Sequence, residues 1–380
     1  MQARRGAAKI MTRKKGSAQA LRVAPQLTIL VRGGMAAGLI AFLASMVLSP
    51  QQGWTSLLMG SYLVLCLALA GVFIIALAYA VNAEWGITLR RVPEAMASAL
   101  PYGAIGLAAV FVFYPSLYPW VANGVHEAAI TGFKKMWLNF PFFLARAGIY
   151  IGTWLLFSAV IVRRSRRQDA RLGGVSAAFL VVFAFTFWLA TTDWIMTLDP
   201  LWYSTIFAVY NFSGLFTSGL AMMILLVLWM RKGPLKGIAR DSQVEDLGKL
   251  LFGFCTFWMY IWFCQYMLIW YANIPEETAY YISRVSRFWL PLFLANVVFN
   301  WLAPFTLLLT RSSKRNPGLL VAAAILVLVG RFLDLFLMVT PAVYGDKPVV
   351  GILEVSIVTG AVCLFLWAFI RGMRRSCAWA

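Results

Sequence analysis

Ten long apolar runs constrain this chain more than any other feature of its sequence. Each is close to the roughly 20 residues that a helix needs to cross a bilayer, and far longer than a strand of a membrane barrel. The chain is 62% hydrophobic and only 12% charged, whereas a soluble domain carries about a quarter charged residues. We therefore predict an all-α integral membrane protein. The expected spans are residues 29–48, 55–81, 98–118, 141–162, 174–196, 203–230, 248–272, 288–310, 318–340 and 350–370.

Basic residues gather on alternate connections between these spans. The N-terminal tail (1–27), the loops 163–173, 231–247 and 311–316, and the C-terminal tail (373–380) are basic. The opposite connections carry only Lys134, Lys135, Arg284, Arg287 and Lys347. Cytoplasmic loops are enriched in Lys and Arg, so we expect both termini in the cytoplasm. This topology, with contact to anionic lipid headgroups, accounts for the net charge of +19 and argues against nucleic-acid binding.

The sequence offers little with which to hold a redox centre. His126 is the single histidine and lies in a predicted loop, whereas haem centres of the cytochrome b kind need several axial histidines. The five cysteines are scattered, without zinc or iron–sulfur spacing. No Walker A or dinucleotide-binding motif occurs. We therefore expect no covalently bound or metal-ligated cofactor in this chain.

A polar stripe runs along the span that begins near Asp246. At 100° per residue, one face of this helix collects Asp246, Lys249, Gly253, Thr256, Tyr260, Cys264, Met267 and Tyr271. The segment ends at two carboxylates, Glu276 and Glu277. Polar groups are costly in hydrocarbon, so we expect this face to turn toward protein or water. It is either a seam against neighbouring helices or a route for protons.

Charged residues inside other spans suggest two ion pairs. Arg331 and Asp334 lie one helical turn apart and can neutralise each other. Asp193 has no local cation, and Arg146 is its natural partner if their helices pack together. Each aspartate lies seven residues before a proline, Pro200 or Pro341. The two segments are either the ends of related four-helix units or a chance match.

Several motifs together resemble a known family. They are WGITLRRVPEA (85–95), FFLARAGIY (142–150), TDWIMTLDPLWYSTIFAVY (192–210), the segment from Asp246 to Glu277, and RFLDLFLMVTP (331–341). They resemble the ActF family, the F subunits of bacterial alternative complex III, which belong to the NrfD-like polysulfide-reductase membrane proteins. The resemblance covers about residues 28–370.

The resemblance implies an architecture and a host complex. We expect one membrane domain (28–372) with two NrfD-like four-helix bundles, about 55–196 and 203–340, and extra helices at 29–48 and 350–370. The host would oxidise a quinol in the bacterial cytoplasmic membrane and reduce a periplasmic acceptor such as cytochrome c. Its partners would be the homologous C subunit, the iron–sulfur B subunit and c-type cytochrome subunits, which would hold the clusters and haem c.

Within that family, this chain is expected to conduct protons, to contact the quinone, or both. A quinol site commonly uses a histidine or a carboxylate as proton acceptor, and the single histidine shifts the expectation toward a structural and proton-conducting role. The residues that the family's path would implicate are Arg146, Asp193, Asp246, Lys249, Tyr260, Glu276, Glu277, Arg331 and Asp334. The alternatives are a secondary transporter, which often shows broken helices at matching positions, and a purely structural scaffold of the complex.

Overall fold

The computed structural model describes residues 24–122, 132–231, 233, 239–345, 348 and 351–377. Within these ranges, ten helical segments are long and apolar enough to cross a membrane. They are α2 (Pro25–Leu48), α3 (Pro50–Ala80), α5–η1–α6 (Arg91–Phe113), α9 (Phe140–Arg167), α10 with η3 (Leu172–Leu198), α11 (Phe207–Met230), α12 (Asp241–Ala272), α14–η4–α15 (Leu290–Leu307), α16 (Pro317–Tyr344) and α17 (Ile352–Cys377). The candidate span within α17 ends at Arg375. The chain is an all-α multi-pass membrane protein, as predicted.

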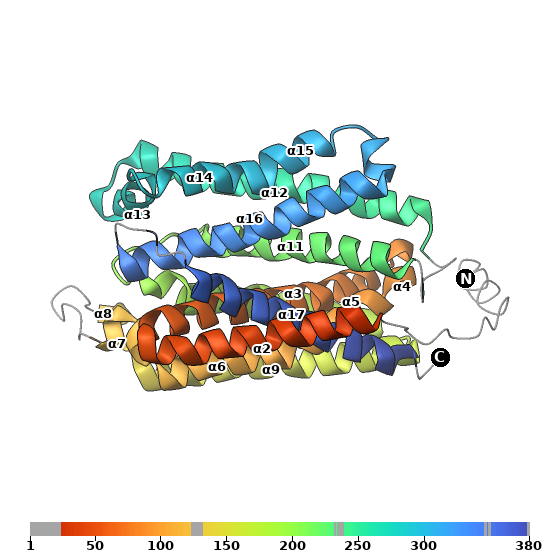
Figure 1. The fold of residues 1–380 in the computed structure, drawn as a ribbon, viewed down its shortest axis with the longest axis horizontal. Helices are drawn as coiled ribbons and strands as arrows, with labels where there is room; N and C mark the ends of the chain where they lie inside the picture. The colour runs from red at the N-terminus through yellow and green to blue at the C-terminus, as the bar shows by residue number, and fades with distance from the viewer. Residues whose placement is uncertain are drawn as a thin grey trace.

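The long helices lie side by side and give the molecule an elongated shape (Figure 1). Short helices lie at its two ends. The left end of Figure 1 carries α7 (Pro119–Ala122), α8 (Gly132–Trp137) and α13 (Pro275–Val285), whereas α4 (Glu84–Leu89) lies at the right end. Helix α2 begins and α17 ends at the right end. We call these the α13 end and the terminal end; that the terminal end faces the cytoplasm stays a prediction.

Local sequence signals explain where the helices begin and end. Proline occupies the first turn of α2, α3, α9 and α16, where its missing N–H costs no hydrogen bond. Asn139 and Asn316 cap α9 and α16 by accepting hydrogen bonds from backbone amides of the first turn. Asn273 adopts a left-handed conformation (φ 49°) and ends α12, and Pro275 then begins α13.

Helices α3 and α11 form the centre of the molecule. In the most apolar stretch of α3 and of α11, 78% of the residues are buried, whereas the same fraction for α2 is 11%. Helix α3 contacts α6, α10, α11 and α17, and α11 contacts α12 and α16. Helix α2 packs on α17 and α3 and leaves much of its apolar surface exposed, as a lipid-facing helix does. Whether these contacts form two related bundles stays a prediction.

Candidate functional site

The first buried ion pair lies on α16. Arg331 Nη1 is 2.7 Å from Asp334 Oδ2, and their side chains are 1% and 0% exposed. Helix α16 is about 42 Å long at 1.5 Å per residue, and both residues lie near its middle. The pairing predicted from their spacing is therefore confirmed. A carboxylate at this depth is tolerated only with partners that replace its hydration.

Neutral polar side chains from two other membrane-spanning segments, α11 and α14–η4–α15, replace part of the hydration of Asp334. The Tyr210 hydroxyl of α11 donates to Asp334 Oδ1, and Asn296 Nδ2 of α14 lies 3.3 Å from the same oxygen. Asn300 Nδ2 donates to Asn296 Oδ1 at 2.7 Å, which extends the network one turn toward the terminal end. We call Arg331, Asp334 and these three residues the Asp334 network.

A second branch leads from Arg331 to the central helix α3. Arg331 Nη2 lies 3.5 Å from Asn211 Oδ1, which also accepts a hydrogen bond from the Tyr62 hydroxyl at 3.2 Å. Arg331 Nε is buried without a hydrogen-bond partner among the described residues. Arg331 therefore has one strong partner, Asp334 at 2.7 Å, and one weak partner, Asn211 at 3.5 Å.

Two glycines and a π-helical turn make room for these polar groups. A Cβ atom on Gly214 would lie 2.3 Å from Arg331 Nη1, and one on Gly330 would lie 2.8 Å from the Asn300 side chain. Asn300 lies in the π-helical turn η4 (Val298–Leu302), a distortion that is frequent at functional sites. The Arg331 and Asn300 side chains therefore fit only because small residues face them.

A small cavity adjoins Asp334 on the side of the α13 end. Its volume is about 20 Å³, and its lining residues are Tyr210, Trp262, Tyr280, Tyr281, Arg284, Phe293, Asn296, Asp334, Leu337 and Met338. A polar cavity of this size has room for about one water molecule. The cavity therefore links Asp334 with the buried face of α13, and it is too small to admit a quinone ring.

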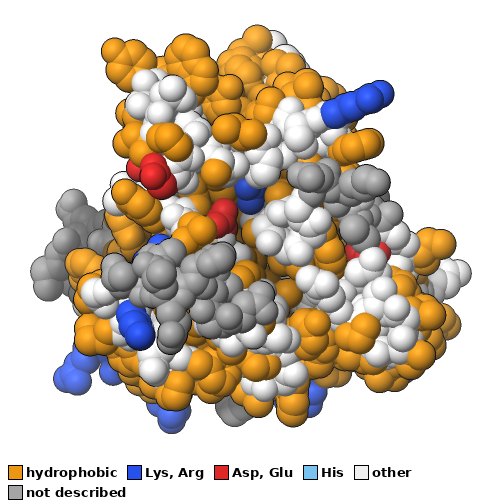
Figure 2. Space-filling view, turned by 90° about the vertical axis from the view of Figure 1, so that its left-hand side faces the viewer, with side chains coloured by type: hydrophobic (Ala, Val, Ile, Leu, Met, Phe, Trp, Pro, Cys, Tyr) orange, Lys and Arg blue, Asp and Glu red, His pale blue; other side chains and the backbone are white. Residues whose placement is uncertain are grey.

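Arg284 closes this cavity without a carboxylate partner in the described structure. Its Nε donates to the Leu337 carbonyl at 2.8 Å, and Nη2 lies 3.2 Å from the Met338 carbonyl. Pro341, inside α16, lacks the amide hydrogen that would normally bond to Leu337, so Arg284 satisfies a carbonyl that the proline frees. Burial lowers the pKa of the Arg284 guanidinium by desolvation. Figure 2 shows the α13 end, where hydrophobic and neutral side chains surround a few isolated charges.

The second buried ion pair joins two helices near the α13 end. Arg146 of α9 binds both oxygens of Asp193 at the end of α10, with Nε and Nη2 distances of 2.8 and 3.0 Å. The Trp137 indole and the Tyr150 hydroxyl also donate to Asp193, at 2.8 and 3.1 Å. The Arg146 guanidinium stacks 4.1 Å from the Trp137 ring. The predicted Arg146–Asp193 pair is confirmed, and four donors hold its carboxylate.

The polar stripe of α12 lies on the exposed face of that helix, away from the interior of this chain. Tyr260 is 61% and Tyr271 83% exposed. Asp246 and Lys249 form an exposed pair at 3.1 Å near the terminal end. The buried face of α12 carries Trp258, Trp262 and other large side chains instead. The stripe therefore does not line the interior of the described chain, and the predicted seam or proton route would need a neighbouring helix from outside it.

The remaining predicted residues also lie apart from the two buried pairs. Glu276 and Glu277 occupy the first turn of α13, where the helix dipole favours carboxylates, and α13 buries Tyr280, Tyr281 and Arg284 instead. Next to Asp246, the buried carboxylate is Glu245, which Arg311 and Arg315 bind at 2.9 and 2.6 Å. His126 lies outside the described residues.

Sequence reasoning missed three members of the Asp334 network, and it missed Tyr62 beside Asn211. Tyr62, Tyr210, Asn296 and Asn300 are single polar residues in apolar runs, as are many residues that only fasten helices together. A usable signal was the Asn296–Asn300 pair, because two amides one helical turn apart in an apolar span need partners. Comparison with protein-family models and with curated proteins found no match, so the family stays a prediction from the sequence.

Proposed function

We propose that this chain is an ActF-like, NrfD-type membrane subunit of a quinol-oxidising respiratory complex in the bacterial cytoplasmic membrane. The motifs between Trp85 and Pro341 and the ten spans support this proposal. The partner subunits, an iron–sulfur protein and c-type cytochromes, carry the redox centres and pass electrons to a periplasmic acceptor. The role proposed for this chain is the transfer of protons that accompanies quinol oxidation, the quinol being oxidised elsewhere in the complex.

The Asp334 network carries this proposal. A proton that reaches Asp334 removes its negative charge and weakens the hold on Arg331. The guanidinium then shifts toward Asn211, whose oxygen already lies 3.5 Å from Nη2. When Asp334 releases the proton, the 2.7 Å pair with Arg331 forms again. The network thus offers two arrangements that differ by one proton, which is what a proton-loading site requires.

The cavity beside Asp334 supplies the outlet in this proposal. A water in the space of about 20 Å³ would take the proton from Asp334 and pass it toward Tyr280 and Tyr281 at the α13 end. The positive charge of Arg284 at this outlet disfavours a bound proton there and so favours release. Asp193 is less suited, because the Trp137 carbonyl also holds its partner Arg146 at 3.1 Å and Asp193 does not line this cavity.

The test is Asp334→Asn in the assembled complex. Asparagine keeps the size of the side chain and one acceptor oxygen but cannot carry the proton. We expect normal amounts of c-haem partner subunits to copurify, with at least a tenfold loss of proton release coupled to quinol oxidation. Asp246→Asn, the same change at the exposed end of α12, is the matched control and is expected to leave coupling unchanged.

Three outcomes distinguish the alternatives. Unchanged proton release by Asp334→Asn, with a fully assembled complex, would refute the relay and leave a structural scaffold. Purification of the tagged chain by itself from mildly solubilised membranes, without c-haem absorbance, would refute the complex and favour a secondary transporter. Restored coupling by Asp334→Glu, which returns a carboxylate, would support proton loading at this position over a requirement for shape alone.

A further inference from the structure

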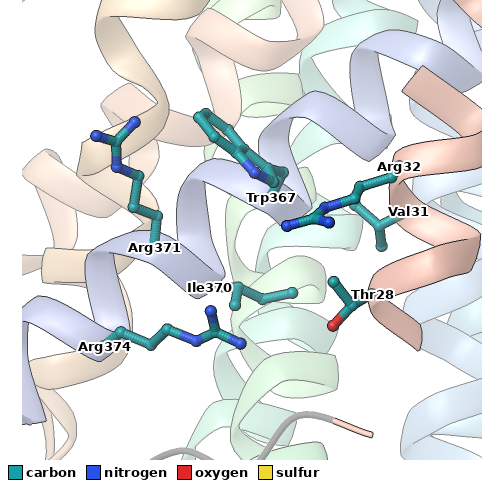
Figure 3. Close-up of a pocket in the computed structure, with 7 residues that line it drawn as sticks. All are labelled: Thr28, Val31, Arg32, Trp367, Ile370, Arg371 and Arg374. Carbon is teal, nitrogen blue, oxygen red and sulfur yellow. The ribbon is translucent and has the colours of Figure 1, made fainter. Parts of the chain in front are cut away.

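A second cavity, of about 240 Å³, lies between α2 and α17 near the terminal end (Figure 3). Helix α2 contributes Thr28 and Arg32, and α17 contributes Trp367, Ile370, Arg371 and Arg374. This cavity is separate from the Asp334 network and shares none of its residues. Nothing in the function proposed above requires it.

The packing of the two helices explains why the cavity is there. A Cβ atom on Gly38 would lie 2.6 Å from the Gly360 Cα, so the backbones of α2 and α17 touch at this point. Small residues permit such close approach between membrane helices. About two turns nearer the terminal end, the facing side chains are Arg32, Trp367 and Arg371, which are long or bulky. The cavity lies among them.

The cavity gathers positive charge that the described part of the chain does not neutralise. Figure 3 shows the guanidinium groups of Arg32 and Arg374 pointing into the same space from the two helices, with the Thr28 side chain at its edge. No described carboxylate forms an ion pair with Arg32, Arg371 or Arg374. Cations that converge in this way repel one another, and an anion between them would offset that repulsion.

Arginine forks and a hydroxyl suit one anion in particular, a phosphate group. The Arg371 guanidinium lies 5.3 Å from the Trp367 ring centroid, and this contact holds one wall of the cavity. Ile370 is 9% exposed and forms an apolar floor. The site therefore offers polar contacts to a phosphate and apolar contact to whatever is attached to it.

The position of the cavity identifies what the phosphate belongs to. Helix α2 is about 36 Å long, which exceeds a hydrocarbon core of about 30 Å. Thr28 lies about 5 Å and Arg32 about 10 Å from the start of this helix, at 1.5 Å per residue, so the long Arg32 side chain reaches from the edge of the hydrocarbon core back toward the headgroups. Farther toward the membrane centre, Leu39, Ile40 and Leu43 are 59%, 66% and 57% exposed, which provides an apolar surface for acyl chains.

We propose that this cavity binds the phosphate of an anionic phospholipid, whose acyl chains lie along the exposed face of α2. The lipid would join α2, the first span, to α17, the last span, at the terminal end. The site takes one phospholipid headgroup, held by Arg32 and Arg374 with Thr28 as an additional donor. A soluble phosphate would find the same guanidinium groups but would leave the apolar surface unused.

Native mass spectrometry of the full chain, purified with its copurifying subunits and delipidated in mild detergent, tests the proposal. The probes are phosphatidylglycerol, phosphatidylcholine with identical acyl chains, and inorganic phosphate. The test variant is Arg32→Gln/Arg374→Gln, which removes both convergent charges. Arg375→Gln is the matched control, since it removes the same charge from the same exposed end of α17 but does not line the cavity.

We expect one tightly bound phosphatidylglycerol on the wild type and on Arg375→Gln, and at least a fivefold weaker affinity for the double variant. Phosphatidylcholine should bind all three proteins equally weakly. Equal phosphatidylglycerol affinity of the double variant and the control would overturn the proposal. Displacement of the lipid by millimolar inorganic phosphate would also overturn it, by showing a site for a free anion. If the double variant does not accumulate, Arg374→Gln alone is compared by the same criteria.

Discussion

The two buried Arg–Asp pairs use the same residue types for different purposes. Arg146 and Asp193 come from two helices and meet near the α13 end, where four hydrogen-bond donors hold the carboxylate. Arg331 and Asp334 come from one helix and meet near the middle of the membrane-spanning region, beside neutral amides and a small cavity. At the first pair, the Trp137 carbonyl also holds Arg146 Nη1 at 3.1 Å, whereas at the second Arg331 Nη2 has only a 3.5 Å contact with Asn211 Oδ1 outside the pair.

The proposal of a proton-loading role for Asp334, and of a helix-joining role for Asp193, rests on this difference. A buried charge pair contributes little net stability when complete, but removal of one partner is costly because the other charge remains in a poor solvent. In the proposed relay, Asn211 receives the guanidinium that protonation of Asp334 releases. The following predictions test this comparison, beginning with the largest effect.

Arg146→Ala is expected to cause the largest loss of stability, because it leaves Asp193 buried without a cation. The expected cost is about 3–5 kcal/mol, measured as a fall in the free energy of unfolding in detergent. The double variant Arg146→Met/Asp193→Leu removes both charges and should recover most of this loss. A double variant as unstable as Arg146→Ala would contradict the view that the pair only joins α9 to α10.

Gly214→Ala is expected to have an intermediate effect on both stability and coupling. The new Cβ atom would lie 2.3 Å from Arg331 Nη1, so the guanidinium must move, at a cost of about 1–3 kcal/mol. We expect proton release coupled to quinol oxidation to fall together with the stability. Gly253→Ala is the control, since no atom lies within 4 Å of its new Cβ. Equal coupling by the two variants would show that the position of Arg331 does not matter.

Tyr260→Phe is expected to have the smallest effect. The residue is 61% exposed on the outer face of α12, so loss of its hydroxyl should change stability by less than about 0.5 kcal/mol. Proton release in the assembled complex should also remain at the wild-type level. A large loss of coupling would return the polar stripe of α12 to the proton path, and would place that path between this chain and a neighbouring subunit.

The membrane spans and the ion pair within one helix could be predicted from the sequence, because both depend on residues that are close together in the chain. The ten apolar runs coincide with the ten helical segments within a few residues at most ends. Arg331 and Asp334 are three residues apart, so helical geometry alone brings them together. Arg146 and Asp193 are 47 residues apart, but two charges in successive apolar spans leave each other as natural partners.

Which face of α12 turns toward the rest of the chain could not be predicted from the sequence in the same way. In a soluble helix the polar face turns outward, but in a bilayer both the lipid and the protein interior are apolar. The aromatic residues of α12 cover most of its circumference, so composition does not distinguish Trp258, which is buried, from Trp270, which is 67% exposed. The cost of polar groups in hydrocarbon predicted a stripe that faces protein or water, and the packing of the aromatic face of α12 against α11 leaves that stripe on the outside of this chain.

The sequence by itself determined the ten apolar segments that the structure shows as helices among its described residues, and it predicts that most of the cations lie on one side of the membrane. Both follow from solvation, because each apolar run must leave water and each backbone group must then bond within its own helix. Only the tertiary structure decided which polar side chains surround each buried charge. Tyr62 and Asn211 are 149 residues apart and Tyr210 and Asp334 are 124 apart, and such contacts depend on how α3, α11 and α16 pack against one another.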